Sequence, residues 1–197
     1  MLELVLVRHG ETDSNIERRF LGWTDMELND RGLYQARCTG EKLKDEKFDG
    51  AYCSPLRRCM KTAQIINENH KLKISVAEDL KERNFGSWEN LTHAEIKEKY
   101  PEEFAGLARD WKNHRAEGGE SAFQTHQRVA GFADSLLTAH KEGKLLIVSH
   151  VGPLKAIITH LLQMEMEALW RFRIDNCGIT RIEINNDGFA YLTMLNG

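Results

Sequence analysis

The 197-residue chain is poor in the features that mark secreted, metal-bound or membrane proteins. No apolar run reaches the roughly 18 residues of a membrane span, and Met1 leads directly into an expected strand without a signal peptide. The net charge of −3 gives no general attraction to nucleic acid or to an anionic membrane. We therefore expect a cytoplasmic protein, monomer or homodimer, with neither of these as a partner. The four cysteines show no C-x-x-C or zinc-ligand spacing, and we expect them to be reduced and partly buried: Cys38, Cys53, Cys59 and Cys177.

The length and a hydrophobic content of 41% fit one globular domain over residues 1–197. Strand-like runs alternate with helical periodicities, which predicts an α/β fold: a three-layer α/β/α sandwich around a mainly parallel, mixed central sheet. The turn-forming residues 185–188 predict a final antiparallel hairpin. Strands are expected at 2–7, 49–53, 73–76, 145–149, 178–184 and 190–195, and helices at 29–44, 55–69, 92–100, 102–112, 121–141 and 151–162.

The first strand ends in Arg8, His9 and Gly10. In an open α/β sheet, ligands bind outside the carboxyl ends of the strands, so His9 is expected to face a crevice. The alternative is a core histidine that hydrogen-bonds to a neighbour. Taken alone, the first strand leaves that alternative open.

Two further strand ends carry similar groups. Ser54 and Arg58 follow the second strand, and His150 follows the strand at 145–149. Ser54 is expected to cap the next helix, with Pro55 as its first residue. If these strands are parallel neighbours, their polar groups converge on helix N-termini at one edge of the sheet. Arginines and free N–H groups suit a dianionic phosphoryl group, so this convergence favours a phosphate site over a core histidine.

The chain resembles the histidine phosphatase (phosphoglycerate mutase-like) superfamily over essentially its whole length. The most specific motif is L-V-R-H-G-E-T at 6–12, with Asn15 beyond it. Residues 54–63 match the family's S-P-L-x-R-A-x-x-T-A except for Cys59. Three further motifs lie at 80–89, 118–121 and 148–150.

The resemblance implies a role for each motif residue. His9 would be the nucleophile and form a phosphohistidine, while its other ring nitrogen would need a backbone acceptor. Arg8, Arg58 and His150 would bind the phosphoryl oxygens. Glu82 would protonate the leaving oxygen and then take a proton from water. Since cationic groups already neutralise the phosphate, no metal or other cofactor is expected.

Three other residues are candidates for contact with the substrate, a small phosphomonoester. Asn15 would donate a hydrogen bond to the phosphoryl group, and Gly22 lies in a loop that resembles the mutase loop at which relatives contact substrate. Arg83 contacts substrate or forms an exposed salt bridge. Taken without its motif, Glu82 would be interpreted as a solvated loop carboxylate. Arg57 is expected to be only a surface charge.

The segment at about 88–118 is expected to be a variable cover over the site. It is shorter than in the cofactor-dependent mutases, whose longer cover retains the phosphorylated enzyme, so a phosphatase is favoured. After His150, many relatives carry Gly-Gly and then arginine, whereas this chain has Val151, Gly152 and, three residues later, Lys155.

Residues 82–89 are similar to the α-ribazole-5′-phosphate phosphatases of cobalamin assembly. Broad-specificity phosphatases share nearly the same motif. A phosphoglycerate mutase is the alternative enzyme, and a non-catalytic phosphate-binding module is the alternative outside catalysis.

Overall fold

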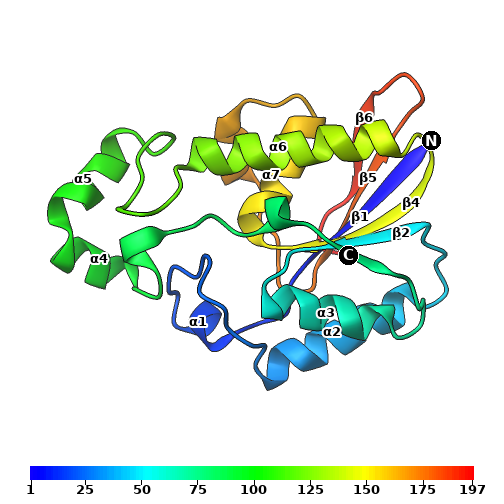
Figure 1. Ribbon diagram of the computed structural model, residues 1–197, viewed down its shortest axis with the longest axis horizontal. Helices are drawn as coiled ribbons and strands as arrows, with labels where there is room; N and C mark the ends of the chain where they lie inside the picture. Colours follow the sequence, from blue (N-terminus) through cyan, green and yellow to red (C-terminus); the bar gives the residue numbers. More distant parts are fainter.

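The computed structural model describes residues 1–197 as three layers around one six-stranded sheet (Figure 1). The strand order is β3-β2-β4-β1-β5-β6; the first four strands are parallel, β5 runs antiparallel to β1, and β6 runs antiparallel to β5. The expected mixed sheet is therefore confirmed. The strands are β1 (Leu2–Arg8), β2 (Gly50–Cys53), β3 (Ile74–Val76), β4 (Gly143–Ser149), β5 (Ile179–Ile184) and β6 (Ala190–Met194).

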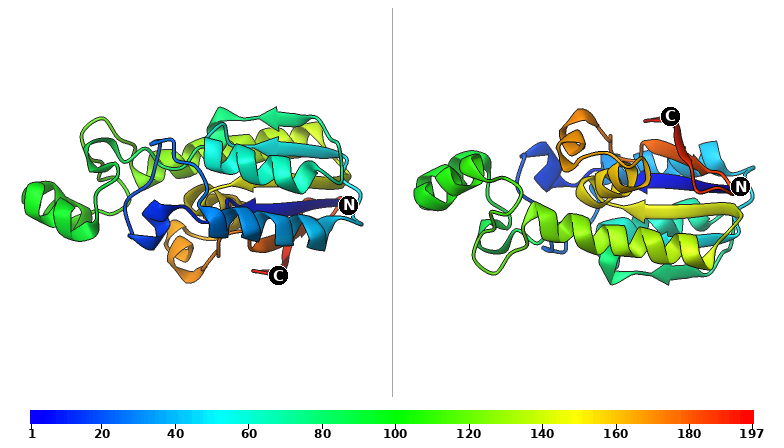
Figure 2. Two further views of the ribbon diagram at one scale, coloured as in Figure 1. Left: turned by 90° about the horizontal axis from the view of Figure 1, so that it is seen from below. Right: turned by 90° about the horizontal axis from the view of Figure 1, so that it is seen from above.

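Helices cover both faces of the sheet. One face carries α2 and α3 and the other α6 and α7, as the two turned views show (Figure 2). Short 3-10 turns occur at Glu78–Leu80, Gly86–Trp88 and at η3 (Met166–Arg171), none of which the sequence predicted. None of the helices is both long and apolar enough to cross a membrane. The helices are α1 (Asp13–Ile16), α2 (Asp30–Leu43), α3 (Arg57–Asn67), α4 (His93–Lys99), α5 (Pro101–Arg109), α6 (Ala122–Ala139) and α7 (Val151–Leu161).

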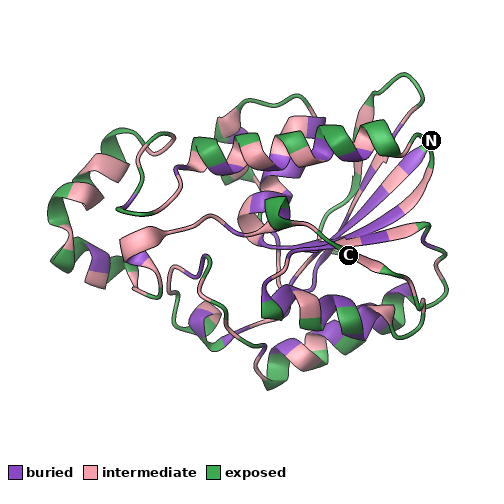
Figure 3. Cartoon of the chain, in the orientation of Figure 1, coloured by how far each residue is buried: buried purple, intermediate pink, exposed green.

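The alternation of side chains along β1 divides the core in two. Leu2, Leu4 and Leu6 join the cluster that includes residues of α6 and α7. Val5 and Val7 point the other way and join the cluster with α3. Both faces of the central strands are therefore buried (Figure 3), which is why β1 reads as a nearly continuous apolar run.

The sheet brings the three predicted strand ends together. β4 lies between β2 and β1, with Arg8 paired to Ser149 and Cys53 to Val148. His9 and His150 each follow directly after these register positions, so the two histidines leave the sheet side by side. Their backbones are joined across the edge, since His9 N–H donates to the Ser149 carbonyl at 2.9 Å.

The predicted start of α3 is wrong. The helix begins at Arg57, with Leu56 in the N-cap position and without a side-chain cap. Extended backbone continues past β2, and the Ser54 hydroxyl lies 2.8 Å from Nε2 of His150 instead. The local Ser-Pro pattern was interpreted as a helix start because this long-range partner is not visible in the sequence.

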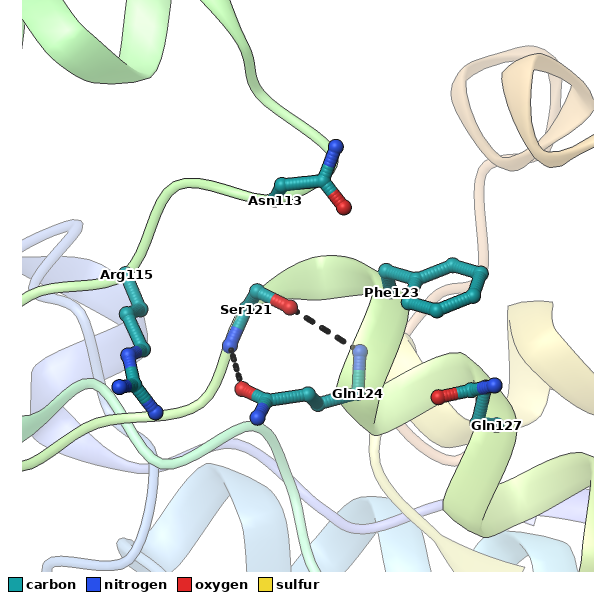
Figure 4. Close-up of a pocket in the computed structure, with 6 residues that line it drawn as sticks. All are labelled: Asn113, Arg115, Ser121, Phe123, Gln124 and Gln127. Atoms are coloured by element: carbon teal, nitrogen blue, oxygen red, sulfur yellow. Dashed lines mark hydrogen bonds between the residues drawn. The ribbon is translucent and has the colours of Figure 1, made fainter.

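The cover segment extends beyond the sheet, where α4 and α5 form the left end of the molecule in Figure 1. It has a small core of its own around buried Trp88 and Ile96. Its end is fixed at the start of α6 by a capping box, in which Ser121 N–H donates to Gln124 Oε1 at 2.9 Å and Gln124 N–H to Ser121 Oγ at 3.1 Å. Figure 4 shows these bonds beside a surface hollow that lies outside the predicted site.

Candidate active site

His9 is held in one tautomer by the backbone. Its Nδ1 lies 2.7 Å from the carbonyl oxygen of Gly10. Because a carbonyl only accepts hydrogen bonds, Nδ1 must carry the proton, and the Nε2 lone pair is left free. The backbone acceptor predicted from the sequence is therefore present.

The surroundings of His9 keep its ring neutral. Only 4% of the residue is exposed. Burial lowers the pKa of His9 well below its ordinary value, and the guanidinium groups of Arg58 and Arg8 lower it further. A neutral imidazole with a free Nε2 is the form that can act as a nucleophile at neutral pH.

His150 packs against His9, with ring centroids 5.1 Å apart and an angle of 63° between the rings. Its Nδ1 accepts from Nε of Arg58 at 3.2 Å, so Nε2 carries the proton and donates to the Ser54 hydroxyl at 2.8 Å. Burial lowers the pKa of His150 well below its ordinary value, and the charges of Arg58 and of the neighbouring His9 lower it further. The second histidine is thus also neutral, and its one N–H is bonded to the Ser54 hydroxyl.

Arg58 is fully buried at the start of α3. Its Nη1 donates to the Thr24 carbonyl at 2.9 Å, its Nη2 to the Gly22 carbonyl at 2.6 Å, and its Nε to His150. A guanidinium has five N–H groups, so these three bonds leave two for a ligand. The side chain is therefore locked in place while part of its donor capacity stays available.

Arg8 adds the second cation at the end of β1. Its Nη1 donates to the Ile174 carbonyl at 2.8 Å, while its buried Nε has no hydrogen-bond partner. Burial lowers the pKa of Arg8, and nearby Glu82 raises it most among the charged neighbours. A buried donor without a partner is uncommon and is explained where a ligand supplies the acceptor.

Glu82 is almost fully buried beside these cations. Its Oε1 accepts from the Arg83 N–H at 3.0 Å, and its Oε2 accepts from the Gly152 N–H, at the N-terminus of α7, at 3.2 Å. Burial raises the pKa of Glu82, and these two backbone bonds, together with Arg58 and Arg8, oppose the rise. A carboxyl whose pKa is raised can hold a proton closer to neutral pH, as a general acid must.

Gly152 makes room for that carboxylate. A Cβ added at this position would lie 2.2 Å from Glu82 Oε1. The preceding Val151 packs on the core cluster of the α6–α7 face instead. Of the two positions at which many relatives carry glycine, this chain therefore keeps the one that the acid requires.

The backbone around Glu82 is fixed by α6. Arg128 donates to the carbonyls of Asp79 and Lys81, at 2.6 and 3.1 Å, and forms an ion pair with Glu120 at 2.9 Å. The Glu82 carbonyl itself accepts from the indole N–H of Trp23 at 2.9 Å. The predicted acid thus lies in a segment tied to two other parts of the chain.

The three predicted substrate contacts lie in different settings. Asn15 lies beside His9, because its Oδ1 accepts from Asn176, whose Nδ2 also donates to the His9 carbonyl. Gly22 offers its carbonyl to Arg58. Arg83 forms no ion pair; its Nε and Nη2 donate to the carbonyls of Glu120 and His114, at 2.7 and 2.9 Å.

Sequence reasoning missed Glu89, the residue that organises the loop around Arg58. Its carboxylate accepts from the backbone N–H groups of Gly22, Trp23 and Thr24, at 3.2, 2.8 and 3.0 Å. It also accepts from the hydroxyl of Thr24 at 2.7 Å and from Phe85 N–H at 3.0 Å. The only signal was its position at the end of the acid-bearing motif.

Two other polar residues that join separate parts of the site were also missed. Thr62 accepts from the Gly10 N–H at 3.0 Å and donates to the Arg58 carbonyl at 2.7 Å, which ties α3 to the loop after His9. The only sequence signal for Thr62 was the Thr-Ala pair that ends the motif at 54–63. Asn176, which bonds His9 and Asn15, carried no signal at all in the sequence.

The arrangement combines a neutral nucleophile, two buried guanidinium groups and a protonatable carboxyl. No group of three or more His, Cys, Asp or Glu side chains is placed to hold a metal ion. Positive charge and N–H donors at the start of α7 suit the transfer of an anionic phosphoryl group between oxygen and nitrogen.

Comparison with known proteins finds phosphatases among the similar sequences and structures. The sequence model of the histidine phosphatase superfamily (branch 1) matches residues 4–197. The chain is 33% identical to adenosylcobalamin/alpha-ribazole phosphatase of Escherichia coli (strain K12), over 99% of this chain and 96% of that protein. It is also 33% identical to phosphoserine phosphatase 1 of Hydrogenobacter thermophilus, over 93% of this chain and 87% of that protein. The crystal structure of the alpha-ribazole phosphatase from Shigella flexneri superposes with a TM-score of 0.94 at 33% sequence identity. The match covers 99% of this chain and 96% of that chain.

Proposed function

Because this chain belongs to the histidine phosphatase superfamily, we propose that it hydrolyses phosphomonoesters through a phosphohistidine at His9, without a metal or other cofactor. The observation that carries this proposal is the bond from His9 Nδ1 to the Gly10 carbonyl, which leaves Nε2 free beside two guanidinium groups. The two half-reactions below assign a role to each residue of the site.

In the first half-reaction, the lone pair of His9 Nε2 attacks phosphorus. The bond between phosphorus and the ester oxygen breaks, and the proton of the Glu82 carboxyl moves to the departing oxygen, which leaves as an alcohol. Arg8 and Arg58 bind the phosphoryl oxygens and stabilise the charge during transfer. His150 joins them when its Nε2–H exchanges the Ser54 hydroxyl for a phosphoryl oxygen. Asn15 adds a further donor beside His9.

In the second half-reaction, the Glu82 carboxylate takes a proton from water. The water oxygen bonds to phosphorus, the bond from phosphorus to Nε2 breaks, and its electron pair returns to His9. Inorganic phosphate leaves, and both residues regain their starting protonation states. Glu82 therefore acts first as an acid and then as a base.

The substrate that we propose is α-ribazole 5′-phosphate, on the strength of the alpha-ribazole phosphatases that match over nearly the full chain. The phosphoserine phosphatase among the relatives makes phosphoserine the second candidate. We further propose that the enzyme works in the cytoplasm as a monomer or homodimer.

A substrate panel tests this proposal. The protein would be incubated, with a chelator present, with α-ribazole 5′-phosphate, phosphoserine, p-nitrophenyl phosphate, and 3-phosphoglycerate with 2,3-bisphosphoglycerate. Release of phosphate, fastest from α-ribazole 5′-phosphate, is the expected result. Isomerisation of 3-phosphoglycerate without net phosphate release would favour a mutase, and absence of turnover on all four would favour a binding module; either result would overturn the proposal.

Glu89→Gln is expected to lower kcat/KM by about 10- to 100-fold through Arg58. The substitution turns one acceptor oxygen into an NH₂ group that faces backbone N–H donors, and so releases the loop of Gly22 and Thr24. Those two residues supply the carbonyls that hold Arg58. Phosphatase assays on p-nitrophenyl phosphate would measure the loss, with exposed Glu17→Gln as the control that leaves the rate unchanged.

A double-mutant cycle separates this positioning role from general damage. If Glu89 acts through Arg58, Glu89→Gln is expected to have little further effect in an Arg58→Gln background. Fully additive losses in the double variant, or a wild-type rate for Glu89→Gln alone, would contradict the role assigned to Glu89.

A further inference from the structure

A tryptophan pair, exposed at Trp170 and half-buried at Trp111, lies where the cover segment meets η3. Trp170 is 70% exposed, and its ring meets that of Trp111 edge-on, with centroids 5.3 Å apart and an angle of 72°. Neither residue belongs to the motifs of the site. Trp170 therefore presents a large aromatic ring to solvent, and an aromatic ring is a surface on which another flat ring can stack.

The pair is held in place by cations. Lys112 forms an ion pair with Glu167 at 2.5 Å, which joins the cover segment to η3, and its ammonium lies 5.8 Å from the Trp111 ring. Lys155 of α7 lies 6.0 Å from the Trp170 ring. Trp111, Trp170 and Lys155 together are called the aromatic platform below.

The aromatic platform borders the active site. Lys155 follows His150 by little more than one turn of α7. Burial lowers the pKa of Lys155, while the charge of Glu82 raises it and that of Arg8 lowers it. The chain after Trp170 also returns to the site, because the Ile174 carbonyl accepts from Arg8. Trp170 and Ile174 are four residues apart in the chain, and four residues of extended chain span at most about 14 Å. The backbone of Trp170 therefore lies within about 14 Å of the residue that binds Arg8.

We propose that the aromatic platform binds a planar heteroaromatic ring on the alcohol part of the substrate, and so selects nucleoside-like 5′-phosphates over small aliphatic phosphates. This inference rests on the phosphatase activity proposed above. The exposed ring of Trp170 offers a π surface on which any flat ring can stack, and the Lys155 ammonium lies 6.0 Å from that ring. An aliphatic phosphate has no ring to place there.

A matched pair of substrates tests the proposal. α-Ribazole 5′-phosphate and ribose 5-phosphate contain the same primary phosphate ester on ribose. They differ in that only the first carries a heteroaromatic ring. The wild-type protein is expected to favour the first in kcat/KM. Trp170→Ala is expected to lower kcat/KM about tenfold for α-ribazole 5′-phosphate, the loss typical of one aromatic–base stack, and to leave ribose 5-phosphate within about twofold.

Two control variants complete the test. Trp170→Phe keeps a π face and is expected to retain most of the preference. Phe189→Ala removes an exposed aromatic residue from the β5–β6 hairpin, which lies by Met1 at the opposite end of β1, and is expected to change neither rate.

The outcomes separate this proposal from the one on which it rests. No hydrolysis of either substrate or of p-nitrophenyl phosphate by the wild-type protein would reject the phosphatase activity. Hydrolysis of both with no wild-type preference would reject the aromatic platform alone. An unchanged preference in Trp170→Ala, or equal losses on both substrates, would reject it as well.

Discussion

His9→Ala is expected to lower phosphatase turnover by about 10⁴-fold or more, because no other group can supply the Nε2 lone pair at that place. The fold should survive the substitution. The ring is neutral and makes one hydrogen bond, to Gly10, so its removal costs about 1–2 kcal/mol of unfolding free energy. Steady-state assays would measure the rate, and thermal unfolding followed by circular dichroism would confirm the folded state.

Phosphoenzyme trapping makes the same prediction chemically specific. Labelled substrate quenched in alkali is expected to leave phosphate on Nε2 of His9, because Nδ1 is occupied by the Gly10 carbonyl. His9→Ala should carry no label, whereas His160→Ala, which removes a histidine paired with Asp134, should label normally. Near-wild-type turnover in His9→Ala, or label on Nδ1, would contradict the assigned nucleophile.

The convergence of strand ends could be predicted because it follows from local pattern and general topology. The apolar run of β1 and the strand at 145–149 predicted buried neighbours, and the structure pairs them in parallel. The capping boxes at Thr92 and Ser121 likewise fix helix starts at the predicted places, because their partners lie only three residues away. Local chemistry was therefore sufficient for these features.

The contacts that fix the site could not be predicted, because they join residues far apart in the chain. Glu89 bonds to residues 65 to 67 positions before it, and Asn176 bonds to Asn15 across 161 residues. Arg83 was expected to contact substrate or to form an exposed salt bridge, yet it donates to the carbonyls of Glu120 and His114. Such pairs depend on how loops far apart in the chain pack together, for which the sequence carries no periodic signal.

Glu82→Gln is expected to damage the site in a way that depends on the leaving group. An alkoxide leaves poorly without a proton, so kcat/KM for α-ribazole 5′-phosphate or phosphoserine should fall by about 10³-fold. A nitrophenolate leaves without protonation, so kcat/KM for p-nitrophenyl phosphate should fall less than about tenfold. kcat/KM includes only the steps up to the first irreversible one, which is departure of the leaving group. The comparison of alkyl with aryl substrates therefore reports on that step and not on hydrolysis of the phosphohistidine.

The pH profile provides a second test of the same carboxyl. Burial raises the pKa of Glu82, so the acid of the free enzyme stays protonated to a higher pH than an exposed glutamate would. As pH rises through this pKa, the proton is lost, and kcat/KM for alkyl phosphates should fall in the wild-type protein. Glu82→Gln should lose this alkaline limb, while Glu117→Gln, which changes an exposed carboxylate on the cover segment, should keep it. Equal losses on alkyl and aryl phosphates, or an alkaline limb that survives in Glu82→Gln, would show that another group delivers the proton.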